Sequence, residues 1–314
     1  MRHVMVLAGG LSHERDVSLR SGRRVADALT RSGSEVHVRD VDQTLVAAIR
    51  STRPEVVWPV LHGATGEDGA LRDVLASLGI AYVGSRPGSC HLTWDKPVAK
   101  ALMAAEGISS PAGVALSHAT FRELGAPALL ESVVDSLGLP LAVKPARGGS
   151  ALGLTIVRSA SDLPSAMVTA YAYGDIVLIE QFVSGTEVAI SMVEDAHGQM
   201  LSLPAVEIVP DGGVYSYEAR YTAGATEFFT PARLSASAAA SAAAASLTAF
   251  RTLGHQHLSR VDLIIDADER PWFLEANVSP GMTETSLLPM AVEGAGLESA
   301  GVYAGIVERA LKTS

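Results

Sequence analysis

The first third of the chain alternates short apolar segments with amphipathic ones. Apolar runs at residues 3–8, 35–41 and 56–63 predict strands, and segments 17–29 and 44–50 between them carry apolar residues at helical spacing. This βαβαβ order predicts a parallel sheet with crossover helices. Loops after the first and third strands then lie at the carboxyl ends of the strands, where such sheets place their ligands.

The rest of the chain mixes strands and helices less regularly. Turn residues at 84–89 interrupt the pattern and indicate a domain boundary. The alanine-rich segment 235–254 is expected to be a helix rather than a linker, because alanine is the best helix former and the segment ends in apolar residues. A helix is also expected at 95–107, with strands at 139–146, 154–158, 175–183, 187–195 and 200–209.

Composition restricts the class of protein. The chain has 314 residues, of which 48% are hydrophobic and 18% charged, which is typical of a globular protein too long for one core. A net charge of -10 without Lys/Arg runs argues against nucleic acid or a membrane surface as partner, although a local basic pocket for phosphate is still compatible with it. No segment has the pattern of a signal peptide or of a membrane span.

The single cysteine excludes an internal disulfide. We therefore expect a reducing cytoplasm, with Cys90 as a small packed residue rather than a reactive one.

Two apolar strands, 260–266 and 271–277, flank a polar turn and predict a β-hairpin. The expected register pairs Asp266 with Pro271 beside the turn.

This register places Asp262 opposite Glu275 and Arg260 opposite Asn277 on one face of the hairpin. Two facing carboxylates repel unless a positive charge lies between them. A Mg²⁺ or Mn²⁺ ion suits oxygen ligands of this kind, usually together with the phosphates of a nucleotide. The alternative is a surface ladder of ion pairs centred on Arg260, and the sequence alone leaves both open.

Two glycine-rich loops are candidates for anion binding. Segment 144–153 follows a strand and offers Lys144, three glycines and Ser150, whose backbone N–H groups can surround a phosphate. It matches neither a Walker A loop nor a GxGxxG motif, and an ordinary turn explains it equally well. In segment 9–22, Ser12 is a candidate helix cap followed by acidic residues in the first turn.

The motifs together resemble the D-alanine–D-alanine ligases of the ATP-grasp superfamily. The resemblance rests on eight blocks in the order of that family: GGLSHERDVSLRSG, LHGATGEDG, DKPVAK, VKPARGGSALG, IEQFVSGTE, YSYEARY, RVDLIID and LEANVSPGMTETSLLPMA. It implies an α/β protein, α+β overall, with the ATP-grasp fold. The three implied domains are an N-terminal Rossmann-like pre-ATP-grasp domain at 1–88, a central ATP-grasp subdomain at 89–182 and a C-terminal ATP-grasp catalytic domain at 183–314.

The resemblance also implies the reaction. ATP phosphorylates the carboxylate of one D-amino acid, and the amine of a second attacks the acylphosphate. Phosphoryl transfer needs alignment and charge neutralisation more than a covalent catalyst. Five residues match the ATP-binding residues of the family: Lys96, Lys144, Glu180 at the adenine edge, Glu187 at the ribose, and Arg220. Three residues match the ligands of two Mg²⁺ or Mn²⁺ ions: Asp262, Glu275 and Asn277.

Further matches concern the two amino acids. Glu14 corresponds to the acid that holds the first ammonium, with Ser150 and Tyr221 as its hydrogen-bonded partners and His62 close by. The matching oxyanion site is Arg260 with the N–H of Gly281, and the matching site for the second carboxylate is Ser286 with the N–H of Leu287. His62 as a structural residue at a strand end and Tyr221 as a packed aromatic are the simpler alternatives.

The chain departs from the family at several positions. Arg220 stands where Lys is common, and a guanidinium is a planar fork rather than a point charge. The other departures are Ser216 for Asp, Ala151 for Ser, Val278 for Thr, and Arg72 with Asp73 for Gln-Gly. They leave the metal ligands intact but put the substrate range in doubt, and Tyr221 instead of Phe favours an amine over a hydroxy-acid acceptor.

These matches favour synthesis of D-alanyl-D-alanine, a peptidoglycan precursor, in a cytoplasmic enzyme. A related ligase for other D-amino acids and a catalytically silent nucleotide-binding regulator are the alternatives. The resemblance further implies a homodimer, and loop 211–231 is expected to close over ATP and exclude water.

Overall fold

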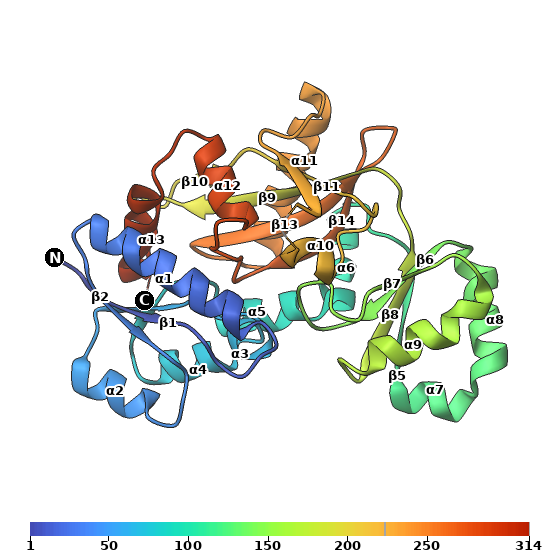
Figure 1. Cartoon of the computed structure of the whole chain (residues 1–314), viewed down its shortest axis with the longest axis horizontal. Helices are drawn as coiled ribbons and strands as arrows, with labels where there is room; N and C mark the ends of the chain where they lie inside the picture. Colours follow the sequence, from blue (N-terminus) through green and yellow to red (C-terminus); the bar gives the residue numbers. More distant parts are fainter. Residues whose placement is uncertain (223, 314) are drawn as a thin grey trace.

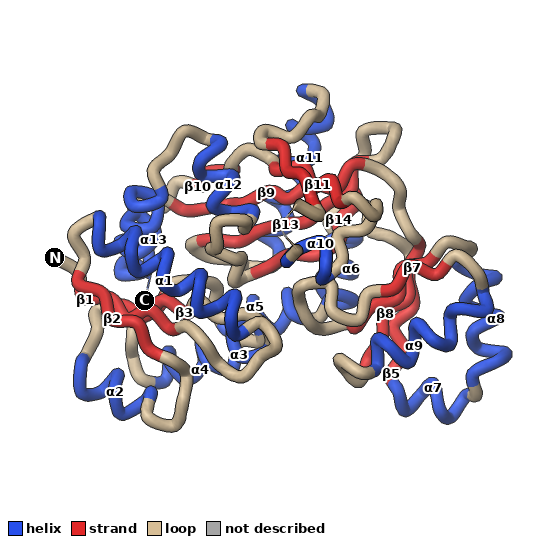
Figure 2. The backbone as a smooth tube through the Cα atoms, in the orientation of Figure 1, coloured by secondary structure: helices blue, strands red, loops and turns tan. Residues whose placement is uncertain are grey.

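The computed structural model describes residues 1–222 and 224–313, and within these ranges the strands form three sheets (Figures 1 and 2). The first sheet is parallel, in the order β2-β1-β3-β4. It is built from β1 (His3–Leu7), β2 (Glu35–Arg39), β3 (Val56–Pro59) and β4 (Ala81–Tyr82). The predicted βαβαβ order is therefore confirmed.

Helices cover both faces of this first sheet. One face packs on α2 (Leu45–Thr52) and α4 (Ala70–Ser77) through a core that includes Leu7, Ile49 and Leu75. The other face packs on α1 (Arg15–Arg31) and on α13 (Ser299–Thr313), the last helix of the chain. The two termini consequently lie close together in Figure 1. The short helix α3 (Ala64–Glu67) follows β3, and α5 (Pro87–Trp94) leads out of the sheet.

The second sheet is antiparallel, in the order β5-β8-β6-β7. Its strands are β5 (Gly113–Ser117), β6 (Leu141–Pro145), β7 (Thr155–Val157) and β8 (Ile176–Gln181). The helices α7 (His118–Leu124), α8 (Ala126–Leu137) and α9 (Leu163–Tyr171) belong to this lobe, with a 3-10 turn at Ala160–Asp162. α8 and α9 pack on one face of the sheet, and the opposite face is left to line a cavity.

The third sheet is antiparallel in the order β12-β11-β9-β13-β14, with β10 paired to β9. Its strands are β9 (Thr186–Glu194), β10 (Met200–Ser202), β11 (Val206–Pro210), β12 (Thr226–Phe229), β13 (Leu258–Ile265) and β14 (Pro271–Asn277). α6 (Lys96–Ala105) and the alanine-rich α11 (Ala236–Thr252) cover one face. The helix prediction for 235–254 is confirmed, with Ser235 accepting the Ala238 N–H at its start.

The β13–β14 register agrees with the prediction at the polar pairs and differs at the turn. Asp262 lies opposite Glu275 and Arg260 opposite Asn277, as expected, but Pro271 pairs with Ile265 rather than with Asp266. The register shifts between Asp262 and Leu263, because β14 carries one extra residue there, a β-bulge.

Two short helices complete the architecture: α10 (Tyr217–Tyr221) between β11 and β12, and α12 (Leu287–Gly294) after the hairpin. None of the helices in the described ranges combines the length and the apolar character needed to cross a bilayer.

Candidate functional site

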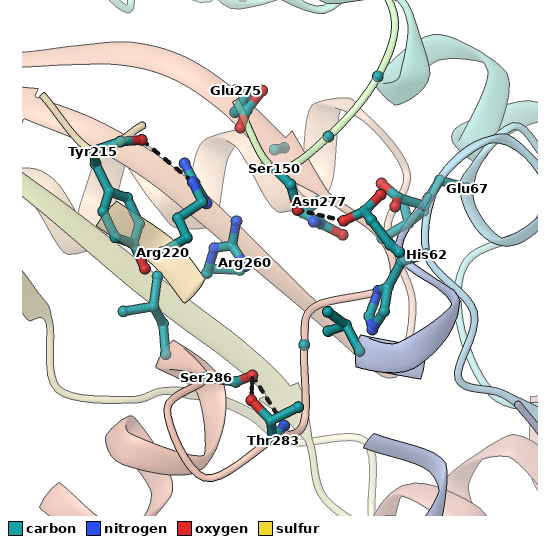
Figure 3. A pocket seen from close by; sticks show the side chains of 18 of the residues that line it. His62, Glu67, Ser150, Tyr215, Arg220, Arg260, Glu275, Asn277, Thr283 and Ser286 are labelled. Atoms are coloured by element: carbon teal, nitrogen blue, oxygen red, sulfur yellow. Dashed lines mark hydrogen bonds between the residues drawn. The ribbon is translucent and has the colours of Figure 1, made fainter. Parts of the chain in front are cut away.

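A larger and a smaller cavity adjoin between the three sheets. The larger cavity, about 410 Å³, lies between the uncovered faces of the second and third sheets. The smaller one, about 80 Å³, opens toward the carboxyl ends of the first sheet and is shown in Figure 3. Lys96, Arg220 and Glu275 line both cavities, so the two spaces meet at these side chains.

All the residues to which the sequence assigned a binding or catalytic role line one of these cavities. The smaller cavity contains Glu14, His62, Lys96, Ser150, Arg220, Tyr221, Arg260, Glu275, Asn277, Gly281, Ser286 and Leu287. The larger cavity adds Lys144, Glu180, Glu187 and Asp262. Residues more than 270 positions apart in the chain therefore face a common space.

A buried cluster of two lysines and one carboxylate lies against the larger cavity. Glu180 on β8 is 2% exposed, and its carboxylate pairs with Lys144 Nζ at 2.5 Å and with Lys100 Nζ at 3.0 Å. Burial raises the pKa of Glu180, but the two lysines outweigh it, so the net pKa is lowered. Burial lowers the pKa of Lys100 to about 8, against the pull of Glu180. Two positive charges thus share one carboxylate, leaving positive charge for an anion in the cavity.

Lys96 lies on the first turn of α6, which confirms the helix expected at 95–107. Asp95 caps this helix by accepting the Val98 N–H, which fixes the orientation of the lysine. Lys96 Nζ pairs with Glu275 Oε2 at 3.1 Å and donates to the carbonyl of Gly148 at 2.5 Å. The lysine therefore connects the hairpin with the glycine-rich loop.

The hairpin presents its polar face to both cavities. Arg260 forms a two-pronged pair with Asp262, with N–O distances of 2.7 and 2.8 Å. Both side chains of this ion pair are buried. The alternative of an ion-pair ladder on the surface around Arg260 is therefore wrong, because the pair does not lie at the surface. Burial lowers the pKa of Arg260, but Asp262 and then Glu275 raise it above its usual range.

Glu275 is held as a carboxylate. Burial raises its pKa, but Lys96, Lys144, Arg220 and Arg260 outweigh burial and hold the pKa at about 2. Four surrounding cations make this face of the hairpin a place for negatively charged ligands.

The hairpin also supplies a donor set for a hard divalent cation. Asp262, Glu275 and Asn277 offer carboxylate and amide oxygens on one face, the ligand type that Mg²⁺ prefers. The side-chain oxygen of Asn277 accepts the Ser279 N–H at 2.8 Å, which fixes the orientation of the amide. This donor set fits Mg²⁺ or Mn²⁺ and does not suit a thiolate-dependent metal.

A chain of hydrogen bonds crosses the smaller cavity. Ser150 Oγ donates to a carboxylate oxygen of Glu14, and it lies 2.7 Å from the Tyr221 hydroxyl. Glu14 is the N-cap residue of α1, and Tyr221 is the last residue of α10. Ser150 reaches them from a backbone with a left-handed φ of 52° in the loop between β6 and β7. One hydroxyl thereby joins all three parts of the molecule.

Ser12 does not cap α1 as the sequence indicated. The N-cap position is Glu14, without a side-chain hydrogen bond to the helix, and Ser12 Oγ instead accepts the N–H of Glu14 at 3.2 Å. This leaves the carboxylate of Glu14 free to face the cavity.

His62 and Glu67 close the end of the smaller cavity near the first sheet (Figure 3). Burial lowers the pKa of His62, and its Nε2 has no hydrogen-bond partner among the described residues. Burial raises the pKa of Glu67 to about 8, with Glu14 adding to the effect. Glu67 Oε1 accepts the Gly63 N–H at 2.8 Å. A neutral imidazole and a protonated carboxyl thus lie beside one negative carboxylate.

The loop before α12 forms the remaining wall. Ser286 is the N-cap residue of α12, and its Oγ accepts the Thr283 N–H at 2.9 Å. A Cβ at Gly281 would come within 2.7 Å of Ser286 Oγ, so a side chain there would displace the Ser286 hydroxyl. The helix start leaves the backbone N–H of Leu287 for an anion.

Arg220 stacks on an aromatic ring. Its guanidinium carbon lies 4.1 Å from the ring centroid of Tyr215, and its Nε donates to the Tyr215 carbonyl at 3.4 Å. Because both residues line both cavities, this stack holds the guanidinium at their junction.

The other positions at which the chain departs from the family pattern lie in different parts of the structure. Ser216 caps α10 by accepting the Ala219 N–H at 3.2 Å, a role that Asp can also fill. Arg72 is 1% exposed and reaches neither cavity; it donates to the carbonyl of Gly66 behind the wall. Ala151 lines the larger cavity and Val278 the smaller one.

Sequence reasoning missed four residues at the site: Glu67, Lys100, Tyr215 and Thr283. All four stand inside segments that were already recognised, so the signal was available. Lys100 follows Lys96 by one turn of α6. The helix expected at 95–107 would by itself have placed both lysines on the same side of that helix.

Known proteins share this architecture over almost the whole chain. A family model described as D-ala D-ala ligase C-terminus matches residues 102–308. A D-alanine–D-alanine ligase of Bordetella petrii is 40% identical over 98% of this chain and 91% of its own length. One of Gloeobacter violaceus is 39% identical over 98% of this chain and 99% of its own.

Solved structures agree with this similarity. The D-alanine–D-alanine ligase of Bacillus anthracis complexed with ATP superposes with a TM-score of 0.83 at 28% identity, covering 99% of this chain and 98% of that one. The VanG D-Ala:D-Ser ligase of Enterococcus faecalis superposes with a TM-score of 0.84 at 25% identity, covering 98% and 99%.

Proposed function

The chain belongs to the D-alanine–D-alanine ligase family and has its ATP-grasp fold, and from this premise we propose how its residues carry out the ligation. The family reaction joins two D-alanine molecules to D-alanyl-D-alanine, with ATP converted to ADP and phosphate, for peptidoglycan synthesis. The observation that supports this function best is the junction of the two cavities at Lys96, Arg220 and Glu275. A nucleotide in one and an amino acid in the other would place phosphate and carboxylate together there.

ATP occupies the larger cavity in this proposal. Lys144 and Lys96 face the phosphates, and Arg220, held on Tyr215, reaches the transferred phosphoryl group from the opposite wall. Glu187 accepts hydrogen bonds from the ribose, and Glu180 lies at the adenine edge while it holds Lys144.

Mg²⁺ or Mn²⁺, as two ions, would be held by Asp262, Glu275 and Asn277 and would neutralise the phosphate charge that builds up during transfer.

The first D-alanine occupies the smaller cavity. Its ammonium pairs with Glu14, whose carboxylate is oriented by the hydroxyl of Ser150 and through it by Tyr221. The neutral imidazole of His62 lies beside this site without competing for the carboxylate as a cation. A carboxylate oxygen of the substrate then attacks the γ-phosphorus, the bond from that phosphorus to ADP breaks, and an acylphosphate forms.

The second D-alanine completes the reaction. Ser286 and the Leu287 N–H bind its carboxylate at the start of α12. Its neutral amine attacks the acyl carbon, so a C–N bond forms, the C–O bond to phosphate breaks, and one proton is released. Arg260 and the Gly281 N–H stabilise the oxyanion of the tetrahedral intermediate.

We place this reaction in the cytoplasm, where ATP is supplied, and propose a homodimer with no nucleic-acid or membrane partner. Segment 211–231, predicted as a loop, contains α10 and β12 in the structure, and we propose that it closes over the nucleotide; its residue 223 lies outside the described residues.

The test is a mass-spectrometric product assay with ATP, Mg²⁺ and single D-amino acids, D-serine and D-lactate among them, alongside phosphate release. We expect D-alanine alone to give the dipeptide with one phosphate per bond. Products from another D-amino acid but not from D-alanine would instead assign a ligase of altered specificity. No product and no ADP from any substrate would point to the silent nucleotide-binding regulator.

A further inference from the structure

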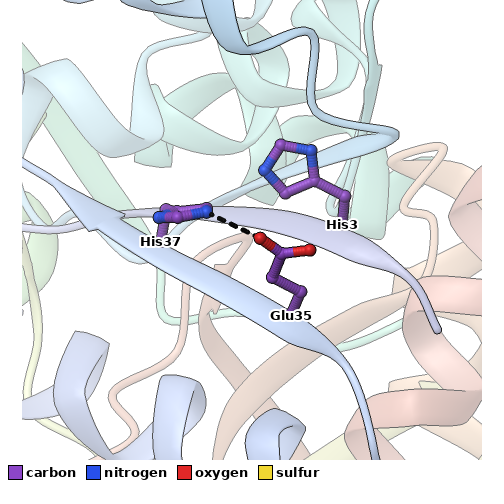
Figure 4. A group of neighbouring side chains, drawn as sticks. All are labelled: His3, Glu35 and His37. Carbon is purple, nitrogen blue, oxygen red and sulfur yellow. Dashed lines mark hydrogen bonds and ion pairs between the residues drawn. The ribbon is translucent and has the colours of Figure 1, made fainter.

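Three side chains with metal-binding atoms gather at the amino end of the first sheet (Figure 4). His3 on β1 pairs with Glu35 on β2, and His37 follows Glu35 by two residues. Side chains that face each other across a parallel pair, or that lie two residues apart on one strand, share a face of the sheet. Among the described residues, this is the one group of three or more His, Cys, Asp or Glu whose ligand atoms lie within 4.8 Å of one another.

The contacts within the group leave a buried nitrogen without a partner among the described residues. His37 Nε2 lies 3.3 Å from Glu35 Oε1, and the two imidazole rings meet edge to face with centroids 5.1 Å apart. His3 Nε2 is shielded from solvent and has no hydrogen-bond partner within the described part of the chain. A buried ring nitrogen without a partner costs free energy, and a metal ion bound there would remove this cost.

The group can close on an ion. Zn²⁺ binds imidazole nitrogen at about 2.0–2.1 Å and carboxylate oxygen at about 2.0–2.2 Å, so two ligands of one tetrahedral ion lie about 3.4 Å apart. His37 Nε2 and Glu35 Oε1 already lie 3.3 Å apart, and side-chain rotations must bring the third ligand atom in from the present spacing of up to 4.8 Å. His37 and Glu35 are about half exposed, with side-chain accessibilities of 52% and 53%, so they are free to make them.

The surrounding charges do not oppose a cation. Arg2, the residue before His3, turns its guanidinium to Glu308 at 2.6 Å and to Glu55 at 3.1 Å. Its positive charge is therefore compensated by two carboxylates outside the group.

We propose that His3, Glu35 and His37 bind a divalent transition metal ion of the Zn²⁺ class, with water completing the coordination. Two imidazoles and one carboxylate form a ligand set that zinc accepts and that Mg²⁺ does not favour. The site lies at the amino ends of β1 and β2, whereas the ligation site lies at the carboxyl ends of the same sheet. It is thus a second, independent metal site that ties the edge strand β2 to β1.

The experiment measures zinc uptake by the full chain. Metal-stripped protein in excess Mg²⁺, which occupies the oxygen ligands of the hairpin, is titrated with ZnCl₂ by calorimetry and checked by elemental analysis after dialysis. We expect one saturable equivalent in the wild type and at least about tenfold weaker binding in His37→Gln and in Glu35→Gln, because each loses one of three protein ligands. Zinc should also raise the melting temperature of the wild type but not of His37→Gln.

His91→Gln is the matched control. His91 is also an exposed histidine beside a carboxylate, with Nε2 3.7 Å from Asp73 Oδ2, but the described residues bring no third ligand to that pair. This variant should bind zinc like the wild type. Equal zinc uptake by His37→Gln and the wild type, or no saturable uptake by the wild type, would overturn the proposal, while leaving the ligation proposal untouched because zinc uptake is read without turnover.

Discussion

Glu275 is the carboxylate on which the charges of both cavities converge. Its pKa of about 2 means that it is ionised at every working pH, and Lys96 Nζ lies 3.1 Å from it. In Glu275→Gln the shape of the side chain is retained, but the cations around it lose their common counter-charge and the metal loses a ligand. We expect turnover to fall by about 10²-fold or more with little change in melting temperature.

Phosphate release with D-alanine and ATP, together with a thermal melt, measures both effects. Glu284→Gln serves as control, because Glu284 is an exposed acid on the neighbouring loop that pairs with Arg24 at 3.2 Å. Wild-type turnover in Glu275→Gln would show that the assignment of the metal ligands is wrong.

Glu67 supports the wall of the smaller cavity in its neutral form. Because burial raises its pKa to about 8, most Glu67 side chains are protonated at pH 7, and the amide of Glu67→Gln copies that state. Gln can still accept the Gly63 N–H, so the free energy of unfolding should hardly change. Glu67→Ala removes the acceptor and leaves this buried N–H unpaired, which costs about 1–3 kcal/mol. Urea unfolding of the two variants distinguishes them, and equal losses would contradict a neutral Glu67.

The short helix α10 contacts the glycine-rich loop across the smaller cavity through its last residue. Tyr221 reaches Ser150 at 2.7 Å, while its ring lies 4.8 Å from that of Tyr217. Tyr221→Phe retains the ring contact and removes the hydroxyl, so α10 should open more often. We expect faster hydrogen exchange in the peptide containing α10 and kcat/KM for D-alanine reduced about tenfold, since Ser150 then orients Glu14 less well.

Tyr217→Phe is the matched control for this helix. The Tyr217 hydroxyl makes no hydrogen bond with any residue in the described ranges, so its loss should change neither exchange nor kcat/KM. If exchange in Tyr221→Phe is no faster than in Tyr217→Phe and the wild type, the ring stack rather than the hydroxyl holds α10.

The hairpin shows how far strand patterning alone can place a site. Alternation put Asp262 and Glu275 on one face, and the structure confirms this pair. A regular strand would also put Phe273 on that face, yet Phe273 is 1% exposed and packs opposite Leu263 in the core. The bulge next to Glu275 reverses the side on which the following residues point. Nothing local in the sequence predicts this bulge. It lets β14 place Phe273 in the apolar core on one side of the sheet and Glu275 toward the cavities on the other.

The whole molecule brings its first and last elements together, which no local pattern predicted. The domain prediction assigned 299–313 to the C-terminal part, but α13 packs on α1, and Arg2 pairs with Glu308. One hydrophobic core accordingly contains side chains from the first sheet, from α13 and from β9. Periodicity predicts that α13 has an apolar face, but the partner of that face depends on contacts between distant parts of the chain.

Two buried histidines join the first sheet to the C-terminal part. His255 Nε2 lies 2.8 Å from Thr93 Oγ1, and His257 Nδ1 accepts the Gly84 N–H at 2.9 Å, so its Nε2 carries the proton toward Thr313. Burial lowers the pKa of His255 to about 3. Burial, followed by nearby arginines, lowers the pKa of His257 to about 4. Both are neutral in the folded protein at ordinary pH.

This junction should make the molecule sensitive to acid. Below the unfolded-state pKa of about 6.5, these two histidines bind protons in the unfolded chain but not in the folded protein. The free energy of unfolding therefore falls as the pH is lowered from about 6.5 toward 4. Each histidine contributes up to about 1.4 kcal/mol per pH unit in this window. Calorimetric melts from pH 7.5 to 4.5 should show a shallower loss in His255→Gln/His257→Asn, whose amides hydrogen-bond without titrating. The exposed His197→Gln should follow the wild type; if the double variant does so too, acid must act on carboxylates elsewhere rather than on this junction.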